Sequence, residues 1–235
     1  TWEDPALTEI KRVEVKYPGE PFVIIAFPTV PQNHPDAPAL QVLDMIMDNS
    51  TAGLLNLNLN QSQKVRKAGS YPRLMNDRGV QHFYAIPKPG QSHAEAEQLL
   101  LDQVALLREG KFDANLLPAI LTDFKKNHLA GLEQDASRVE RLRDAYIART
   151  EWSTALTELD RIQAVTKADV IRVAQAYFNP KAYVSGHRIE GPHTFTAMDK
   201  PSIDPIPIDP TRRSAFTRKL LAEEVPPATP SWIVA

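Results

Sequence analysis

The chain has 235 residues and a formal net charge of −2, with 43% hydrophobic and 24% charged residues, which is typical of a globular protein with its own core. This balance excludes the basic excess of a nucleic-acid-binding protein. The lack of cysteine excludes disulfides, thiolate zinc ligands and a cysteine nucleophile, and no apolar run approaches the roughly 20 residues of a membrane span.

Strands and helices alternate in the N-terminal part of the chain. Residues Ile10–Tyr17 alternate apolar and polar side chains, which predicts a strand with one face in water. After a turn at residues 18–21, the continuously apolar Phe22–Phe27 is predicted to be a buried strand antiparallel to the first. Further along, we expect a helix at Ala37–Met47, a short helix at Leu54–Gln61 and a strand at Gly79–Pro87.

From Ser92 onward the apolar residues recur with the helical period. Ser92 and Glu95 form a capping box, and Gly110 ends that helix. The later pattern predicts a helix from Asp113, helices at Ser137–Thr150 and Ser153–Gln163, a helix capped by Thr166 and Asp169, and a strand at Ala182–His187. This order predicts an α+β fold, with helices on one face of a mainly antiparallel sheet.

The chain is predicted to divide into a folded domain, residues 1–190, and a proline-rich linker, residues 191–235. Seven of the 20 prolines lie at position 201 or later, where they disfavour packed helices and central strands. Only Arg213–Glu224 has helical spacing there. Five apolar residues of the linker would be exposed to water unless another surface covers them, so we expect the linker to lie on a neighbouring surface. They are Ile203, Ile206, Ile208, Trp232 and Ile233.

The six histidines do not form a metal-binding motif. Neither His-x-x-x-His nor His-x-x-Glu-His occurs. His93 and Glu97 are four residues apart and are the one pair that offers two ligands. We favour the interpretation that Glu95 and Glu97 are first-turn carboxylates stabilised by the helix dipole. We therefore expect no metal site.

No catalytic residue is predicted either. Ser185 lacks the strand-turn-helix context that exposes a nucleophile. His187 and His193 are expected in a solvated turn, and His128 at the boundary of an apolar helix face.

Four segments together resemble the insulinase/pitrilysin family of zinc metallopeptidases. The segment TKADVIRVAQAYF, residues 166–178, is similar to a helix near the end of each repeat of that family. Three others match in the same order: HPDAPALQVLDMIM after the apolar strand, GLLNLNL, and LLLDQVALLREGKFD. The resemblance covers about residues 10–190.

The resemblance implies one non-catalytic repeat of a larger enzyme. Members have four α+β repeats that close over a peptide, and the first carries His-x-x-Glu-His. This chain lacks that motif, as the non-catalytic repeats do. Its proline-rich connector resembles the link from the second repeat to the third, so the resemblance implies the second repeat. Zinc is then a cofactor of the parent enzyme and not of this chain, and the partners are the other repeats of the polypeptide and peptide substrates. Exported bacterial members imply a periplasmic or secreted location, with a cytoplasmic one left open.

The resemblance also places the family's substrate-anchoring strand at Lys67–Tyr71. Ala68, Gly69 and Ser70 are the implied substrate-binding residues, since small side chains let a peptide backbone approach. The other interpretation is an ordinary turn into a strand. Asn60 replaces a family arginine. The predicted function is to form the peptide-chamber wall and to assist substrate binding in a zinc metalloendopeptidase. Two alternatives are a catalytically dead scaffold, like the core subunits of respiratory complexes, and a free-standing binding module.

Overall fold

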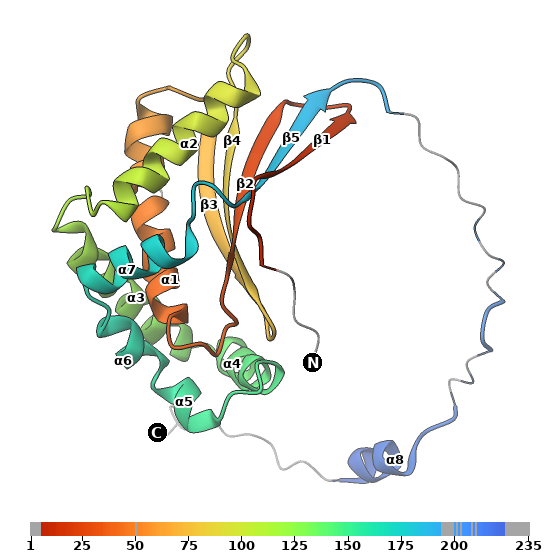
Figure 1. Ribbon diagram of the computed structural model, residues 1–235. Coiled ribbons are helices and arrows are strands. Elements are labelled where there is room, and N and C mark those ends of the chain that lie inside the picture. The colour runs from red at the N-terminus through yellow and green to blue at the C-terminus, as the bar shows by residue number, and fades with distance from the viewer. Residues whose placement is uncertain are drawn as a thin grey trace, which may run out of the picture. The chain divides into compact units, whose positions relative to one another are not determined.

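The structure is a computed structural model that describes residues 6–49, 51–193, 200, 202, 204–207, 209 and 211–223. The chain divides into two compact units, residues 1–193 and 194–235. The elements of the first unit, shown in Figure 1, are β1 (Lys11–Tyr17), β2 (Phe22–Thr29), α1 (Ala37–Met47), η1 (Asn56–Gln61), β3 (Lys67–Leu74), β4 (Gly79–Ile86), α2 (His93–Arg108), α3 (Leu116–Leu132), α4 (Asp135–Ile147), α5 (Trp152–Leu156), α6 (Glu158–Gln163), α7 (Lys167–Tyr177) and β5 (Val184–Glu190).

The sheet of the first unit has the strand order β1-β5-β2-β4-β3. Strands β1 and β5 are parallel, and the other three pairs are antiparallel. Helices α1, α2 and α7 pack on one face of this sheet (Figure 1). The predicted fold class, helices on one face of a mainly antiparallel sheet, is confirmed.

One expectation about β1 is confirmed and one is wrong. Strand β2 runs antiparallel to β1, as predicted, but the two strands do not pair directly, because β5 lies between them. The turn at residues 18–21 allows either arrangement, because two strand spacings of about 5 Å each are within reach of four residues. All seven residues of β1 are exposed, so the strand has two wet faces and not one. Its apolar side chains Val13 and Val15 remain 50% and 48% exposed.

The core lies between the sheet and the helices. On β2 and β4, alternate residues point toward α1, α2 and α7 and are buried, while their neighbours are half-buried. Helix α1 has the predicted bounds, because its apolar spacing runs unbroken along this face. The largest completely buried side chains are Tyr183, Phe27, Phe83, Phe178, Ile25, Leu40, Leu43, Ile46, Met47, Leu55, Leu59 and Leu100.

Local signals located the starts of two helices. Ser92 with Glu95 and Thr166 with Asp169 both form the predicted capping boxes, which fix the starts of α2 and α7. The predicted helix at residues 153–163 is divided into α5 and α6 at Thr157. The short helix expected at residues 54–61 continues as the π-helix η1.

The second unit contains helix α8 (Ala215–Ala222), inside the predicted helical segment, with the Ser214 side chain as its N-cap. Of the linker residues expected to need cover, Ile206 is 85% exposed. The other four, at positions 203, 208, 232 and 233, lie outside the described residues. Among the residues that the structure describes, no helix is long and apolar enough to cross a membrane.

Candidate functional site

The predicted substrate-binding residues lie on β3, the strand at the sheet edge opposite β1. Ala68 is buried, and the side chain of Asn60 on η1 binds both of its backbone groups. The Asn60 carboxamide accepts from the Ala68 N–H at 2.7 Å and donates to the Ala68 carbonyl oxygen at 2.9 Å. Those backbone groups point away from β4, toward the outer edge of the sheet. The Asn60 side chain binds them there, in the place where a further strand would pair.

Ser70, the next edge-facing residue of β3, is bound to the last turn of α1. Its hydroxyl donates to Asp44 Oδ1 at 2.6 Å, and its N–H donates to Asp48 Oδ2 at 3.1 Å. Two residues farther on, Pro72 has no N–H to offer. This edge is therefore closed by side-chain contacts and by proline along most of its length.

Gly69 lies between these two residues and is tightly surrounded. A Cβ atom at Gly69 would lie 2.7 Å from the Tyr84 hydroxyl and 2.8 Å from Asp48 Oδ2. Gly69 was expected to let a peptide backbone approach, but the space beside it is filled by Tyr84 and Asp48 of the same chain.

Asp44 is a functional candidate that sequence reasoning missed. Burial raises the pKa of this carboxyl to about 6, although hydrogen bonds from Ser70 and Gln81 act in the opposite direction; the nearby charge of Asp48 raises it further. A signal was present, because Asp44 follows Leu40 by four residues and so lies on the apolar face of α1.

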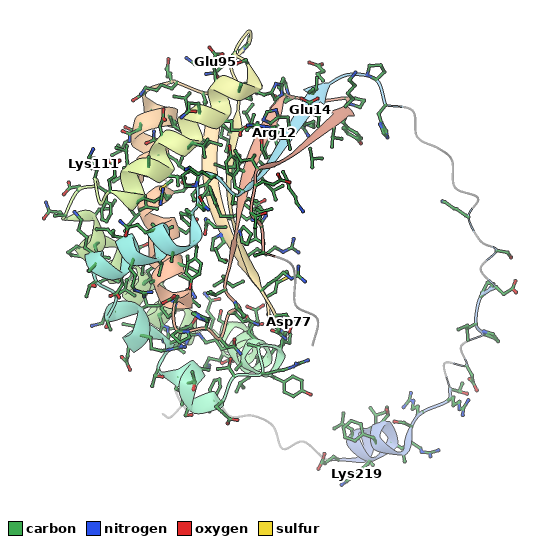
Figure 2. All side chains as sticks on the ribbon, viewed as in Figure 1. Arg12, Glu14, Asp77, Glu95, Lys111 and Lys219 are labelled. Atoms are coloured by element: carbon green, nitrogen blue, oxygen red, sulfur yellow. The ribbon has the colours of Figure 1, made fainter. Side chains whose placement is uncertain are left out.

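A second polar cluster surrounds Glu97 of α2, which is only 3% exposed. Its carboxylate accepts hydrogen bonds from Tyr183 at 2.6 Å, Ser185 at 2.7 Å and His187 at 2.7 Å. Arg12, labelled on β1 in Figure 2, adds an ion pair at 3.2 Å. Burial by itself raises the pKa of Glu97, but the three hydrogen bonds and the Arg12 charge outweigh it and leave the pKa below its ordinary value.

This cluster contains serine, histidine and glutamate, yet it is not a catalytic triad. In a triad the acid binds the ring nitrogen that faces away from the serine. Here Ser185 Oγ lies 3.2 Å from His187 Nε2, and Glu97 binds that same nitrogen. Ser185 is also completely buried. His187, expected in a solvated turn, lies within β5 against Glu97.

The interpretation of Glu97 as a first-turn carboxylate stabilised by the helix dipole is wrong. Glu95 has that role, whereas Glu97 points into the core. His93 stacks on His187 with ring centroids 5.2 Å apart, and its Nε2 lies 2.8 Å from the Arg188 carbonyl oxygen. In the part of the chain that the structure describes, no three His, Asp or Glu residues are grouped to hold a metal ion.

Two further histidines were singled out in the sequence. His128 is half-buried and lies against the Arg141 guanidinium, with Nδ1 at 2.7 Å. Burial and the Arg141 charge lower the pKa of His128. The His193 ring lies 5.9 Å from that of Tyr17.

The family model described as the peptidase M16 inactive domain matches residues 3–122, just over half of the chain. The chain belongs to the peptidase M16 family. The match is to its inactive domain, in agreement with the missing His-x-x-Glu-His motif. Among proteins of curated function, none matches this M16 sequence.

Solved structures share the fold of this M16 domain. A protease from Helicobacter pylori superimposes with a TM-score of 0.74 at 16% identity, covering 79% of this chain and 45% of its own. The inactive peptidase domain of a Bordetella parapertussis protein assigned as a zinc protease gives 0.65 at 20%, with coverages of 74% and 94%. The peptidase M16 inactive domain from Pseudomonas fluorescens gives 0.67 at 16%, with coverages of 85% and 47%.

These identities show a shared fold and nothing finer. The chain spans about half the length of the Helicobacter and Pseudomonas chains. Zinc, which the family implies, does not fit the M16 domain described here. The buried carboxylate of Glu97 and the half-buried carboxylate of Asp44 are already bound by donors of the protein itself, and the described residues form no metal-binding group.

Proposed function

We propose that this chain is a non-catalytic unit of a zinc metalloendopeptidase, in which it forms part of the peptide-chamber wall and assists substrate binding. The observation that carries the proposal is the match to an inactive domain, together with the buried Glu97 carboxylate, which the protein's own donors already bind. The catalytic zinc then belongs to another repeat of the parent. The position as second repeat and export from the cytoplasm are parts of the same proposal, and the insulinase/pitrilysin resemblance supports them.

Zinc content and peptide hydrolysis test this function directly. We expect the purified chain to contain no stoichiometric zinc and to leave a quenched fluorogenic peptide library intact, while the full-length parent binds zinc and hydrolyses it. Zinc-dependent activity in the chain alone would overturn the proposal. An inactive, zinc-free parent would favour the scaffold instead.

We further propose that peptide substrates bind at the β3 edge by replacing Asn60 and Asp48. The Asn60 carboxamide donates to one backbone group of Ala68 and accepts from the other, as the facing residue of an added antiparallel strand does. A peptide backbone can therefore replace it without leaving the buried Ala68 groups unpaired. Such binding needs few side-chain contacts, which suits a protease of broad sequence range.

Two asparagine variants distinguish a role of Asn60 in peptide binding from a role in folding. If Asn60 competes with the peptide, Asn60→Ala should lower the Kd of a fluorescein-labelled extended peptide about tenfold, because two competing hydrogen bonds of about 0.5–1.5 kcal/mol each are removed. Asn56→Ala is the matched control, since Asn56 lies one turn earlier and its side chain donates to the Thr51 carbonyl oxygen instead of binding Ala68. An unchanged or higher Kd for Asn60→Ala would refute peptide anchoring at Ala68 and leave the zinc test unaffected.

A further inference from the structure

The two edge strands of the sheet, β3 and β1, differ in whether their outward-directed backbone groups are bound. At β3, Asn60 binds the edge-facing groups of Ala68, and Asp48 binds the N–H of Ser70. Strand β1 at the opposite edge is seven residues long, fully exposed and free of proline. A long open edge of this kind is a template for pairing with another strand, which proteins normally block.

The direction of the free backbone groups on β1 follows from its pairing with β5. The Lys11 N–H donates to the Tyr183 carbonyl oxygen, and the Tyr17 carbonyl accepts from Gly191. The odd-numbered residues of β1 therefore bond to β5. The even-numbered ones, Arg12, Glu14 and Lys16, direct N–H and C=O away from the sheet, and no described residue bonds to these groups.

The side chains of β1 alternate in the same way. Arg12, labelled in Figure 2, reaches Glu97 on α2, so the even-numbered residues lie on the helix side of the sheet. The odd-numbered residues lie on the other side, and the last three of them form an exposed apolar stripe. Val13, Val15 and Tyr17 are 50%, 48% and 41% exposed.

The sequence KRVEVKY is complementary to itself in one antiparallel register. With Val15 opposite Val15 of a second copy, Glu14 faces Lys16 twice and Val13 faces Tyr17 twice. Opposite charges and apolar side chains are then paired across the strands, which is favourable on both faces. The backbone agrees, because Glu14 and Lys16 carry the outward-directed groups and form hydrogen-bonded pairs, while Val15 lies at a non-hydrogen-bonded position on the twofold axis.

We propose that two copies of this chain associate through antiparallel pairing of their β1 strands about Val15. Two five-stranded sheets then join into one continuous sheet, and the apolar stripes of both copies meet on its surface. The contact is isologous and closes on itself, so it yields a dimer and not a fibre. This assembly goes beyond the proposed function and does not depend on it.

The lack of native cysteine permits a direct test of the register. The two Val15 Cα atoms would be about 4.5 Å apart, within the range of about 4.4–6.8 Å for a disulfide. The two Val13 residues would be four residues out of register, about 13 Å apart along the strands. Under mild oxidation Val15→Cys should become a covalent dimer, whereas Val13→Cys, equally exposed on the same face, should stay uncross-linked.

Exchanging the charges of Glu14 and Lys16 tests the same contact independently. By light scattering after size exclusion, the wild type should be a dimer, and Glu14→Lys should raise the dimer Kd about tenfold because it opposes two pairs of like charges. The double variant Glu14→Lys with Lys16→Glu should restore the wild-type Kd. A monomeric wild type, equal cross-linking of both cysteine variants, or a double variant as weak as Glu14→Lys would each overturn the proposal.

Discussion

The carboxylate of Glu97 accepts a hydrogen bond from the His187 ring at 2.7 Å, and this contact joins α2 to β5 across 90 residues of sequence. The same carboxylate binds Tyr183 and Ser185, so one side chain attaches the last strand of the sheet to the helix layer. A buried carboxylate with several donors is a concentrated source of stability, since removing it leaves each donor unpaired.

Replacement of Glu97 should therefore be costly. We expect Glu97→Ala to lower the free energy of unfolding by about 3–5 kcal/mol, because the donors and the Arg12 charge lose their acceptor. Urea denaturation followed by circular dichroism measures this loss. Gln98→Ala, at the adjacent exposed position of α2, should stay within about 0.5 kcal/mol of wild type. Similar losses for both variants would show that Glu97 has no special structural role.

Gly69 should tolerate no side chain without rearrangement. The Cβ of Gly69→Ala would lie 2.7 Å from the Tyr84 hydroxyl and 2.8 Å from Asp48 Oδ2, closer than such atoms approach. We expect the variant to lose about 1–3 kcal/mol of stability, the usual cost of overpacking. Gly131→Ala is a matched control, since a Cβ at that helical glycine meets nothing within 4 Å and removes backbone entropy from the unfolded chain. A Gly69→Ala variant as stable as Gly131→Ala would contradict the close packing.

The sequence patterns were sufficient for local structure where one physical cause dominates. Helix α1 follows from unbroken apolar spacing, and the starts of α2 and α7 follow from capping boxes at Ser92 and Thr166. The sheet order did not follow, because the short turn at residues 18–21 allows either direct pairing of β1 with β2 or insertion of β5 between them.

The burial of Glu97 could have been predicted from periodicity alone. Glu97 precedes Leu100 by three residues and Val104 by seven, which places it on the apolar face of α2. Its partners were out of reach, because nothing local indicates that residues 183–187 return to that face. Such contacts depend on how distant segments of the chain pack together, which local sequence patterns do not indicate. Export from the cytoplasm stays a prediction.

Asn60 should stabilise the β3 edge in the absence of peptide. Asn60→Ala removes both hydrogen bonds to Ala68 and leaves its buried N–H without a partner, at an expected cost of about 1–3 kcal/mol. Asn60→Asp keeps the acceptor for the N–H and should retain part of that stability. Hydrogen exchange provides the local measurement, with the Ala68 amide exchanging faster in Asn60→Ala. Unchanged protection of that amide would show that the Asn60 contact is not formed in solution.

Asp44 should make stability depend on pH in the direction opposite to most carboxylates. Burial raises its pKa from 3.8 to about 6, so between these values the folded chain keeps a proton that the unfolded chain has released. Stability from this group is therefore complete below pH 4, falls as the pH rises toward 6, and stays reduced above that value. Each unit of pKa shift corresponds to about 1.4 kcal/mol.

Asp44→Asn isolates this effect, because the amide oxygen still accepts from Ser70 and Gln81 but does not titrate. Compared with wild type by urea denaturation, the variant should gain about 2 kcal/mol between pH 4 and pH 7.5. The comparison of two chains cancels the titration of Glu97, whose lowered pKa removes stability as the pH falls. A variant less stable than wild type at pH 7.5 would mean that the ionised carboxylate is favoured at the end of α1, and that the contact with Ser70 holds the β3 edge through charge.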